Sequence, residues 1–252
     1  MERSATDDLI DLADSPSLVM PDELGRKLIE RDGYVVVARP GWGTVEQIRL
    51  GDLDAAVRDV AAIGREHGLA HLNWWVGKHS TPPDLAERLV AAGFETDPEM
   101  PLSRTLTLTE PPAGEATADI RRVGSAEEYA LTREIAAAIW PPMGAQPDPR
   151  EEWEQLSGSD ASQLYLAYLD GDPAGFGRAV FTPAATLLLG GAVLPEARGR
   201  GVYVSLVHAR WDDSVARSVP RLLVGAGPMS APILERLGFE QIGTASLFRQ
   251  RL

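Results

Sequence analysis

The stretch from Thr186 to Glu240 constrains the fold of this 252-residue chain more than any other. An apolar run over residues 186–194 is stopped by a proline, and a helical pattern begins directly after the turn Glu-Ala-Arg-Gly-Arg-Gly at 196–201. A second apolar run, 222–224, precedes a last helical pattern that closes on Leu-Gly-Phe at 237–239. The pattern predicts strand, turn, helix, strand and helix.

The turn carries the chemistry of this stretch. Gly199 and Gly201 permit positive φ and leave backbone N–H groups accessible to a ligand. The helix that follows offers unpaired amides at its positive end, which suits a pyrophosphate. Arg198 and Arg200 add fixed positive charge. The alternative is a purely structural helix start, in which Arg and Gly form a solvent-exposed turn that binds no ligand.

Two familiar phosphate-binding loops do not fit this turn. A P-loop needs Gly-Lys-Ser/Thr, but Val202 and Tyr203 follow Gly201. A dinucleotide fingerprint needs a third glycine where Val204 stands. Arg-Gly-Arg-Gly after the strand instead resembles the acyl-CoA motif Gln/Arg-x-x-Gly-x-Gly/Ala of the GNAT superfamily of N-acyltransferases. Residues 234–239, Leu-Glu-Arg-Leu-Gly-Phe, resemble the last helix and turn of that family.

The resemblance covers about the second half of the chain and implies the site. In the family, the strand before the motif bulges and leaves its neighbour, and the cosubstrate pairs with its backbone. The pair Gly190-Gly191 marks such a bulge here. Acetyl-CoA would then be the cosubstrate, with no metal. The residues expected to bind it are Ala192, Val193, Leu194, Arg198, Gly199, Arg200, Gly201, Val202 and Tyr203.

Two residues depart from the family pattern. Tyr203 stands where the motif has Gly or Ala, and Leu234 stands where the family often has a tyrosine acid. Tyr203 and Ser230 are the candidates to replace that catalytic acid, because a tyrosine is protonated at neutral pH and Ser230 precedes Leu234 by one helical turn. The alternatives are packing for Tyr203, helix capping for Ser230, and proton transfer through water.

The N-terminal half repeats the order of elements. Residues 74–77 correspond to 222–225, and Gly-Phe-Glu at 93–95 corresponds to 238–240. The first half has Leu-Gly-Asp at 50–52 in place of the Arg-Gly turn. We predict a degenerate GNAT-like domain over 1–110, a linker over 111–116 and an acyl-CoA-binding domain over 117–252. Two unrelated halves are the alternative.

The predicted fold class is α+β. Each half would be a mostly antiparallel twisted sheet with flanking helices and one parallel β-α-β crossover. In the first half we expect helices over 22–31 and 52–67, a helix capped at Thr81, and a last strand over 102–108. The family resemblance also places Trp140, Met143 and Trp153 in the acceptor pocket; packing in the core is the alternative for them.

Composition narrows the function classes. A net charge of −13 argues against a nucleic-acid surface, and no cysteine is present for thioester or metal chemistry. His67 and His71 are separated by Gly68, which disfavours a metal pair. The sequence shows neither a signal peptide nor an apolar run long enough to span a membrane, so we expect a cytoplasmic protein, a monomer or homodimer.

The predicted function is that of an N-acetyltransferase, moving an acetyl group from acetyl-CoA to the amine of a small molecule. The alternative is a catalytically weak or inactive acyl-CoA-binding protein, since Leu234 cannot donate a proton.

Overall fold

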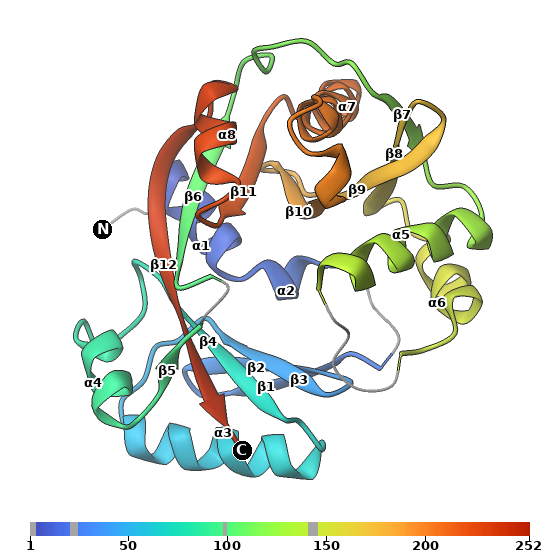
Figure 1. Ribbon diagram of the computed structural model, residues 1–252. Coiled ribbons are helices and arrows are strands. Elements are labelled where there is room, and N and C mark those ends of the chain that lie inside the picture. The colour runs from blue at the N-terminus through green and yellow to red at the C-terminus, as the bar shows by residue number, and fades with distance from the viewer. Residues whose placement is uncertain (1–3, 21–24, 98–99, 141–145) are drawn as a thin grey trace.

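The computed structural model describes residues 4–20, 25–97, 100–140 and 146–252. Within these residues a 12-stranded sheet runs through the whole molecule, with helices on both faces (Figure 1). Its order is β1-β2-β3-β4-β12-β6-β11-β10-β9-β8-β7, and β5 also pairs with β12. Among the paired strands, β3–β4 and β10–β11 run parallel and the others antiparallel. The predicted α+β class is confirmed.

The elements have the following bounds. The helices are α1 (Ala5–Asp14), α2 (Pro16–Val19), α3 (Leu53–Glu66), α4 (Leu85–Ala91), α5 (Ala126–Ile139), α6 (Pro149–Leu156), α7 (Val202–Ala216) and α8 (Ala231–Arg236). The strands are β1 (Lys27–Arg31), β2 (Tyr34–Arg39), β3 (Trp42–Glu46), β4 (His71–Val76), β5 (Glu95–Thr96), β6 (Leu102–Leu108), β7 (Asp119–Arg122), β8 (Ser162–Leu169), β9 (Asp172–Phe181), β10 (Thr186–Val193), β11 (Leu222–Ala226) and β12 (Glu240–Arg251).

Each half contains one parallel crossover. In the first, β3 leads through α3 to β4; the Asp52 carboxylate caps α3 by accepting from Ala55 N at 3.0 Å. In the second, β10 leads through α7 to β11. Strand β10 is buried on both faces: Leu188 packs with Val207 of α7, and Leu187 packs with Leu9 of α1. An uninterrupted apolar run is what such a strand requires.

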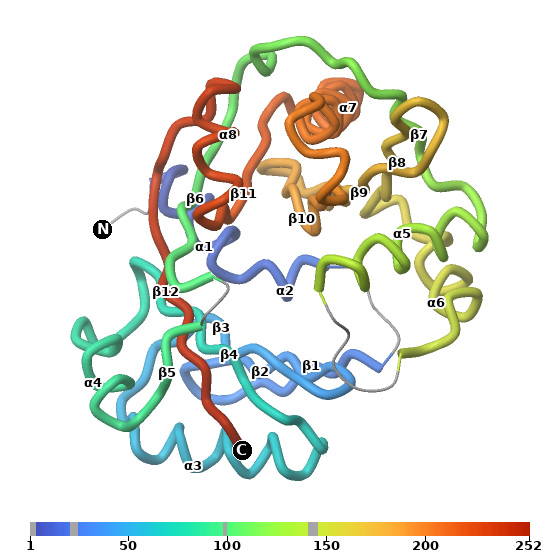
Figure 2. Tube along the Cα trace, viewed as in Figure 1, coloured from blue at the N-terminus to red at the C-terminus, as the bar shows by residue number. Residues whose placement is uncertain are grey.

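The two halves exchange their last strands. Strand β12 pairs with β6 over Glu240–Ser246 and then with β4 over Ser246–Arg251. Strand β6, although it belongs to the first half of the chain, pairs with β11 along its other edge. The tube in Figure 2 shows β12 running from the C-terminal half down into the N-terminal half. Each half's sheet is therefore completed by the other half's last strand.

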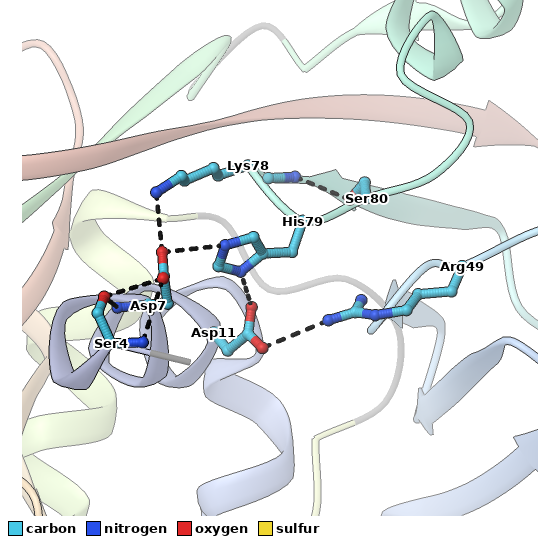
Figure 3. A network of polar contacts seen from close by, with 8 residues as sticks. Ser4, Asp7, Asp11, Arg49, Lys78, His79 and Ser80 are labelled. Carbon is cyan, nitrogen blue, oxygen red and sulfur yellow. Dashed lines mark hydrogen bonds and ion pairs between the residues drawn. The ribbon is translucent and has the colours of Figure 1, made fainter. Parts of the chain in front are cut away.

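Helix α1 joins the halves from the side. Its apolar residues pack on the C-terminal sheet, and its acidic residues reach the N-terminal half (Figure 3). The polar contacts are Lys78 Nζ to Asp7 at 2.8 Å, His79 Nδ1 to Asp11 at 2.6 Å, His79 Nε2 to Asp7 at 3.2 Å and Arg49 Nη2 to Asp11 at 3.3 Å.

Two local predictions were wrong. Residues 27–31 form an edge strand paired with β2, where a helix over 22–31 was expected; pairing with the valine-rich β2 overrides their helix propensity. Residues 21–24 lie outside the described residues. Thr81 does not cap a helix, because its backbone is bonded to Ile48 and Leu50 at 3.0 Å each, and α4 begins only at Leu85.

Candidate functional site

The two parallel strands of the C-terminal half separate after a short pairing. Strand β10 pairs with β11 only at Thr186–Leu222 and Leu187–Leu223, although it continues to Val193. Its pairing with β9 shifts register between Leu189 and Ala192, and Gly190 has φ 56°. The bulge predicted at Gly190-Gly191 is confirmed. Strand β10 is therefore no longer paired with β11 toward its carboxyl end.

The corresponding place in the N-terminal half is closed. Strands β3 and β4 pair at four positions, from Trp42–His71 to Val45–Trp74. Beyond these strands the chain is joined again, because Thr81 N donates to Ile48 O and Leu50 N donates to Thr81 O. The backbone groups of Ile48, Leu50 and Thr81 are thus already bonded to one another at this place.

The glycine turn has the geometry that its sequence predicts. Gly199 has φ 74° and Gly201 has φ 80°, and α7 begins immediately afterwards at Val202. A Cβ on Gly199 would meet nothing within 4 Å, whereas one on Gly201 would lie 2.2 Å from Thr117 Oγ1. Gly199 therefore leaves the backbone open to solvent, and Gly201 makes room for the Thr117 side chain.

The arginines of the turn already have partners. Arg200 Nη2 lies 2.7 Å from the Asp170 carboxylate, and both side chains are exposed. Arg198 Nε donates to Val193 O at 3.2 Å. Asp170 sits at the tip of the β8–β9 hairpin, which is why the sequence around the turn did not reveal it. The positive charge of the turn is smaller than its two arginines alone suggest.

Arg210, in the middle of α7, does not lie at the turn. It is fully buried between α7 and the sheet, where Nε donates to Leu206 O at 2.8 Å. A Cβ on Gly177 would lie 3.2 Å from its guanidinium, and one on Gly191 would lie 3.8 Å away. Burial lowers the pKa of Arg210, and Nη2 finds no partner among the described residues.

Tyr203 lies on the helix side of the bulge. A Cβ on Gly191 would be 3.0 Å from Tyr203 Cε2, so the absent side chain of Gly191 makes room for the ring. The ring packs against the core that contains Leu188 and Leu234. Burial raises the pKa of the Tyr203 phenol, which keeps its proton in place at neutral pH.

Ser230, the other candidate acid, makes one long hydrogen bond with its side chain. Ser230 precedes α8, but its side chain does not cap the helix; Oγ donates to Gly227 O at 3.4 Å. Leu234 is completely buried in the same core as Tyr203. The position that often carries a tyrosine acid in the GNAT superfamily is therefore a packing position in this chain.

A cavity of about 840 Å³ reaches the bulge from the opposite side. Its walls come from both halves and from the exchanged strand β12, a set that the sequence order did not reveal. Of the three residues predicted for an acceptor pocket, Trp140 lines this cavity and Trp153 packs on Tyr129 at 6.1 Å between ring centres. Met143 lies outside the described residues. Near the bulge, the cavity is lined by Leu189, Gly190 and Phe176. The N-terminal half contributes Trp42 and His71, and strand β12 contributes Leu247 and Arg249.

Comparison with known proteins finds a family match within the C-terminal half. Residues 129–239, less than half of the chain, match the model of the acetyltransferase (GNAT) family. The chain is accordingly an acyltransferase. No curated protein matches the sequence.

Similar solved structures extend over nearly the whole chain. A GCN5-related N-acetyltransferase from Kribbella flavida is 17% identical, with a TM-score of 0.67 over 96% of this chain and 94% of the other. A tandem GNAT protein from the clavulanic acid biosynthesis pathway is 16% identical, with a TM-score of 0.61 over 96% and 87%. A protein of unknown function from Staphylococcus epidermidis is 14% identical, with a TM-score of 0.64 over 92% and 95%. At these identities the likeness concerns the fold.

Metal-binding clusters and membrane-spanning helices are absent from the described part of the chain. It contains no group of three or more His, Asp or Glu side chains arranged to hold a metal ion. No helix in it is both long and apolar enough to cross a membrane.

Proposed function

We propose that this chain transfers an acetyl group from acetyl-CoA to the amine of a small molecule. The separation of β10 from β11 beside the Gly199–Gly201 turn carries the proposal. The pyrophosphate would be held by amides of the turn and of the first turn of α7, at the positive end of that helix. The pantetheine arm would pair with the backbone of Ala192, Val193 and Leu194.

The transfer forms one bond and breaks another. The neutral amine attacks the thioester carbonyl carbon, the C–S bond breaks, the amine loses a proton and the CoA thiol gains one. The chain has to orient the amine, offer donors to the carbonyl oxygen and supply or relay protons. The amine would arrive through the 840 Å³ cavity, which meets β10 at Gly190.

The N-terminal half is, on this proposal, a copy of the same fold that no longer binds the cosubstrate. Residues 1–110 would form this copy, 111–116 the linker and 117–252 the binding domain. The crossover β3-α3-β4 repeats the order of β10-α7-β11. Two features of this crossover oppose an anionic ligand. Thr81 is bonded to Ile48 and Leu50 where the ligand would enter, and the acidic Asp52 stands at the start of α3.

Tyr203 is the proposed general acid for the departing thiolate. Its ring lies against Gly191 of the bulge, and burial keeps it protonated. In Tyr203→Phe we expect turnover to fall by about tenfold or more while acetyl-CoA binding is nearly unchanged, because the ring still packs. Thiol release measures turnover, and calorimetry measures binding. Ser230→Ala is the parallel variant; full turnover in both variants would leave water as the proton donor.

Thiol release from acetyl-CoA over a panel of amines tests the proposal as a whole. Amine-dependent release together with the acetylated product supports it. Binding of acetyl-CoA without release for any amine would instead favour the alternative, a binding protein that has lost catalysis.

A further inference from the structure

An aromatic wall stands directly beside the bulge. A Cβ on Gly190 would lie 3.5 Å from Phe176 Cε2, so the Phe176 ring borders the bend in β10. The Trp140 ring meets Phe176 edge to face, with 6.4 Å between ring centres. Trp140 is 43% exposed and lines the cavity, so part of its ring is open to a ligand.

The far side of the cavity is also rich in large apolar groups. Trp42 and Trp75 come from the N-terminal half, and Trp42 is held by the Arg39 guanidinium 5.1 Å from its ring centre. Met20, Met100 and Leu247 add flexible or branched apolar surface. A ligand that fills both sides would bury apolar surface against both halves of the chain, which is the main source of affinity in such sites.

The charges of the lining disfavour a polycation. Two carboxylates, Asp97 and Glu152, line the cavity among the described residues, together with four arginines. Asp97 is 2.6 Å from Arg249, and Glu152 is 2.8 Å from Arg133. A ligand with several ammonium groups would lose its hydration in this cavity, and both carboxylates are already paired with arginines.

We propose that the acceptor is a monoamine with a bulky aromatic body, seated on Trp140 and Phe176 next to the bulge and reaching toward Trp42. This inference rests on the proposed acetyl transfer and narrows its substrate class. Trp140 determines specificity close to the reacting amine, and Trp42 does so for the distal part of the acceptor.

The test compares four amines on the full chain. Phenethylamine and 4-phenylbenzylamine carry one and two rings, ethanolamine carries none, and spermidine is polycationic. We expect kcat/KM for the aromatic amines to exceed that for ethanolamine and spermidine by about tenfold or more, the scale set by burying an aromatic ring. Preference for spermidine or ethanolamine would overturn the inference while leaving acetyl transfer intact.

Variants locate the effect. Trp140→Ala should lower kcat/KM for both aromatic amines by about tenfold and leave kcat/KM for ethanolamine nearly unchanged. Trp140→Phe, which keeps an aromatic ring, should retain most of the kcat/KM for the aromatic amines. Trp42→Ala should affect only the two-ring amine. Val90→Ala, at an exposed site on α4 outside the cavity lining, is the control. An equal loss for all amines in Trp140→Ala contradicts a specificity role.

Failure of the proposed reaction is recognised separately. If no amine is acetylated, calorimetric titration of 4-phenylbenzylamine into the full chain still measures the site. Binding that weakens in Trp140→Ala but not in Val90→Ala supports an aromatic monoamine as the ligand of this cavity. Absence of binding refutes that ligand class.

Discussion

At the scale of single residues, Asp14 illustrates how a helix is fitted between the two halves. Its carboxylate is buried at the end of α1, and a Cβ on Gly77 would overlap it, so a glycine is required on the facing loop. Burial, reinforced by the charge of Asp11, raises the pKa of Asp14 to about 7. The group also lines a second cavity, of about 320 Å³, in the N-terminal half.

This raised pKa predicts a pH dependence of stability. Because the folded state holds the Asp14 proton more tightly than the unfolded chain, whose pKa is near 3.8, this group stabilises the fold most at low pH. Its contribution is lost as the pH rises from about 4 to about 7. In Asp14→Asn the free energy of unfolding should exceed that of the wild type at pH 8 by roughly 2–4 kcal/mol, with little difference at pH 4.

Urea unfolding at several pH values measures this difference. Asp84→Asn, at an exposed residue whose side chain makes no capping bond, should follow the wild-type curve. A difference between Asp14→Asn and wild type that does not change with pH would contradict the account.

At the scale of elements, the contact of strand β10 with helix α7 sets the position of the site. The first turn of the helix carries Tyr203 where the family motif has Gly or Ala, and the strand has Gly191 opposite it at the bulge. The large residue and the missing side chain are complementary. The helix start can therefore stay close to the strand despite the bulk of Tyr203.

This complementarity predicts a coupled pair of mutations. Gly191→Ala places a methyl group 3.0 Å from the Tyr203 ring, so it should destabilise the chain by about 1–3 kcal/mol. In Gly191→Ala/Tyr203→Ala the contact no longer exists, and the cost of the glycine substitution should largely disappear. Denaturation of the four proteins in a double-mutant cycle measures the coupling. Additive effects would show that ring and bulge do not constrain each other.

At the scale of the whole molecule, the exchanged strands make the halves interdependent. A fragment of residues 117–252 lacks β6, which leaves the edge of β11 unpaired and β12 without a neighbour on that side. Exposed edges of this kind favour aggregation.

We therefore predict that fragment 117–252 aggregates or remains unfolded, whereas fragment 101–252, which retains β6, is more soluble and more protected from hydrogen exchange. Size-exclusion chromatography and amide exchange compare the two fragments with the full chain. A monomeric, folded 117–252 fragment would contradict the interdependence inferred from the sheet order.

The sequence predicts those parts of the structure that depend on interactions between residues close together in the chain. The strand–turn–helix around Gly199 and Gly201, the bulge at Gly190 and the α+β class depend on local patterns, and they were predicted. The order of β6 and β12 depends on which edges meet after collapse, which no local pattern specifies. For the same reason Asp170, Phe176 and Trp42 were missed. Asp170 meets Arg200 from 30 residues away in the sequence, Phe176 reaches the bulge through the pairing of β9 with β10, and Trp42 belongs to the other half of the chain.

The most direct test of the central claim is calorimetric titration of acetyl-CoA into the full chain and three variants. Gly199 has open space on its side-chain side, and Asp and Asn tolerate its positive φ better than other residues. Gly199→Asp should weaken binding by at least about tenfold, and Gly199→Asn, which lacks the charge, should weaken it less. Gly51→Asp, at the corresponding turn of the N-terminal half, should bind as the wild type does, with one site per chain. Absence of binding to the wild type, or a loss in Gly51→Asp that equals the loss in Gly199→Asp, would contradict the account.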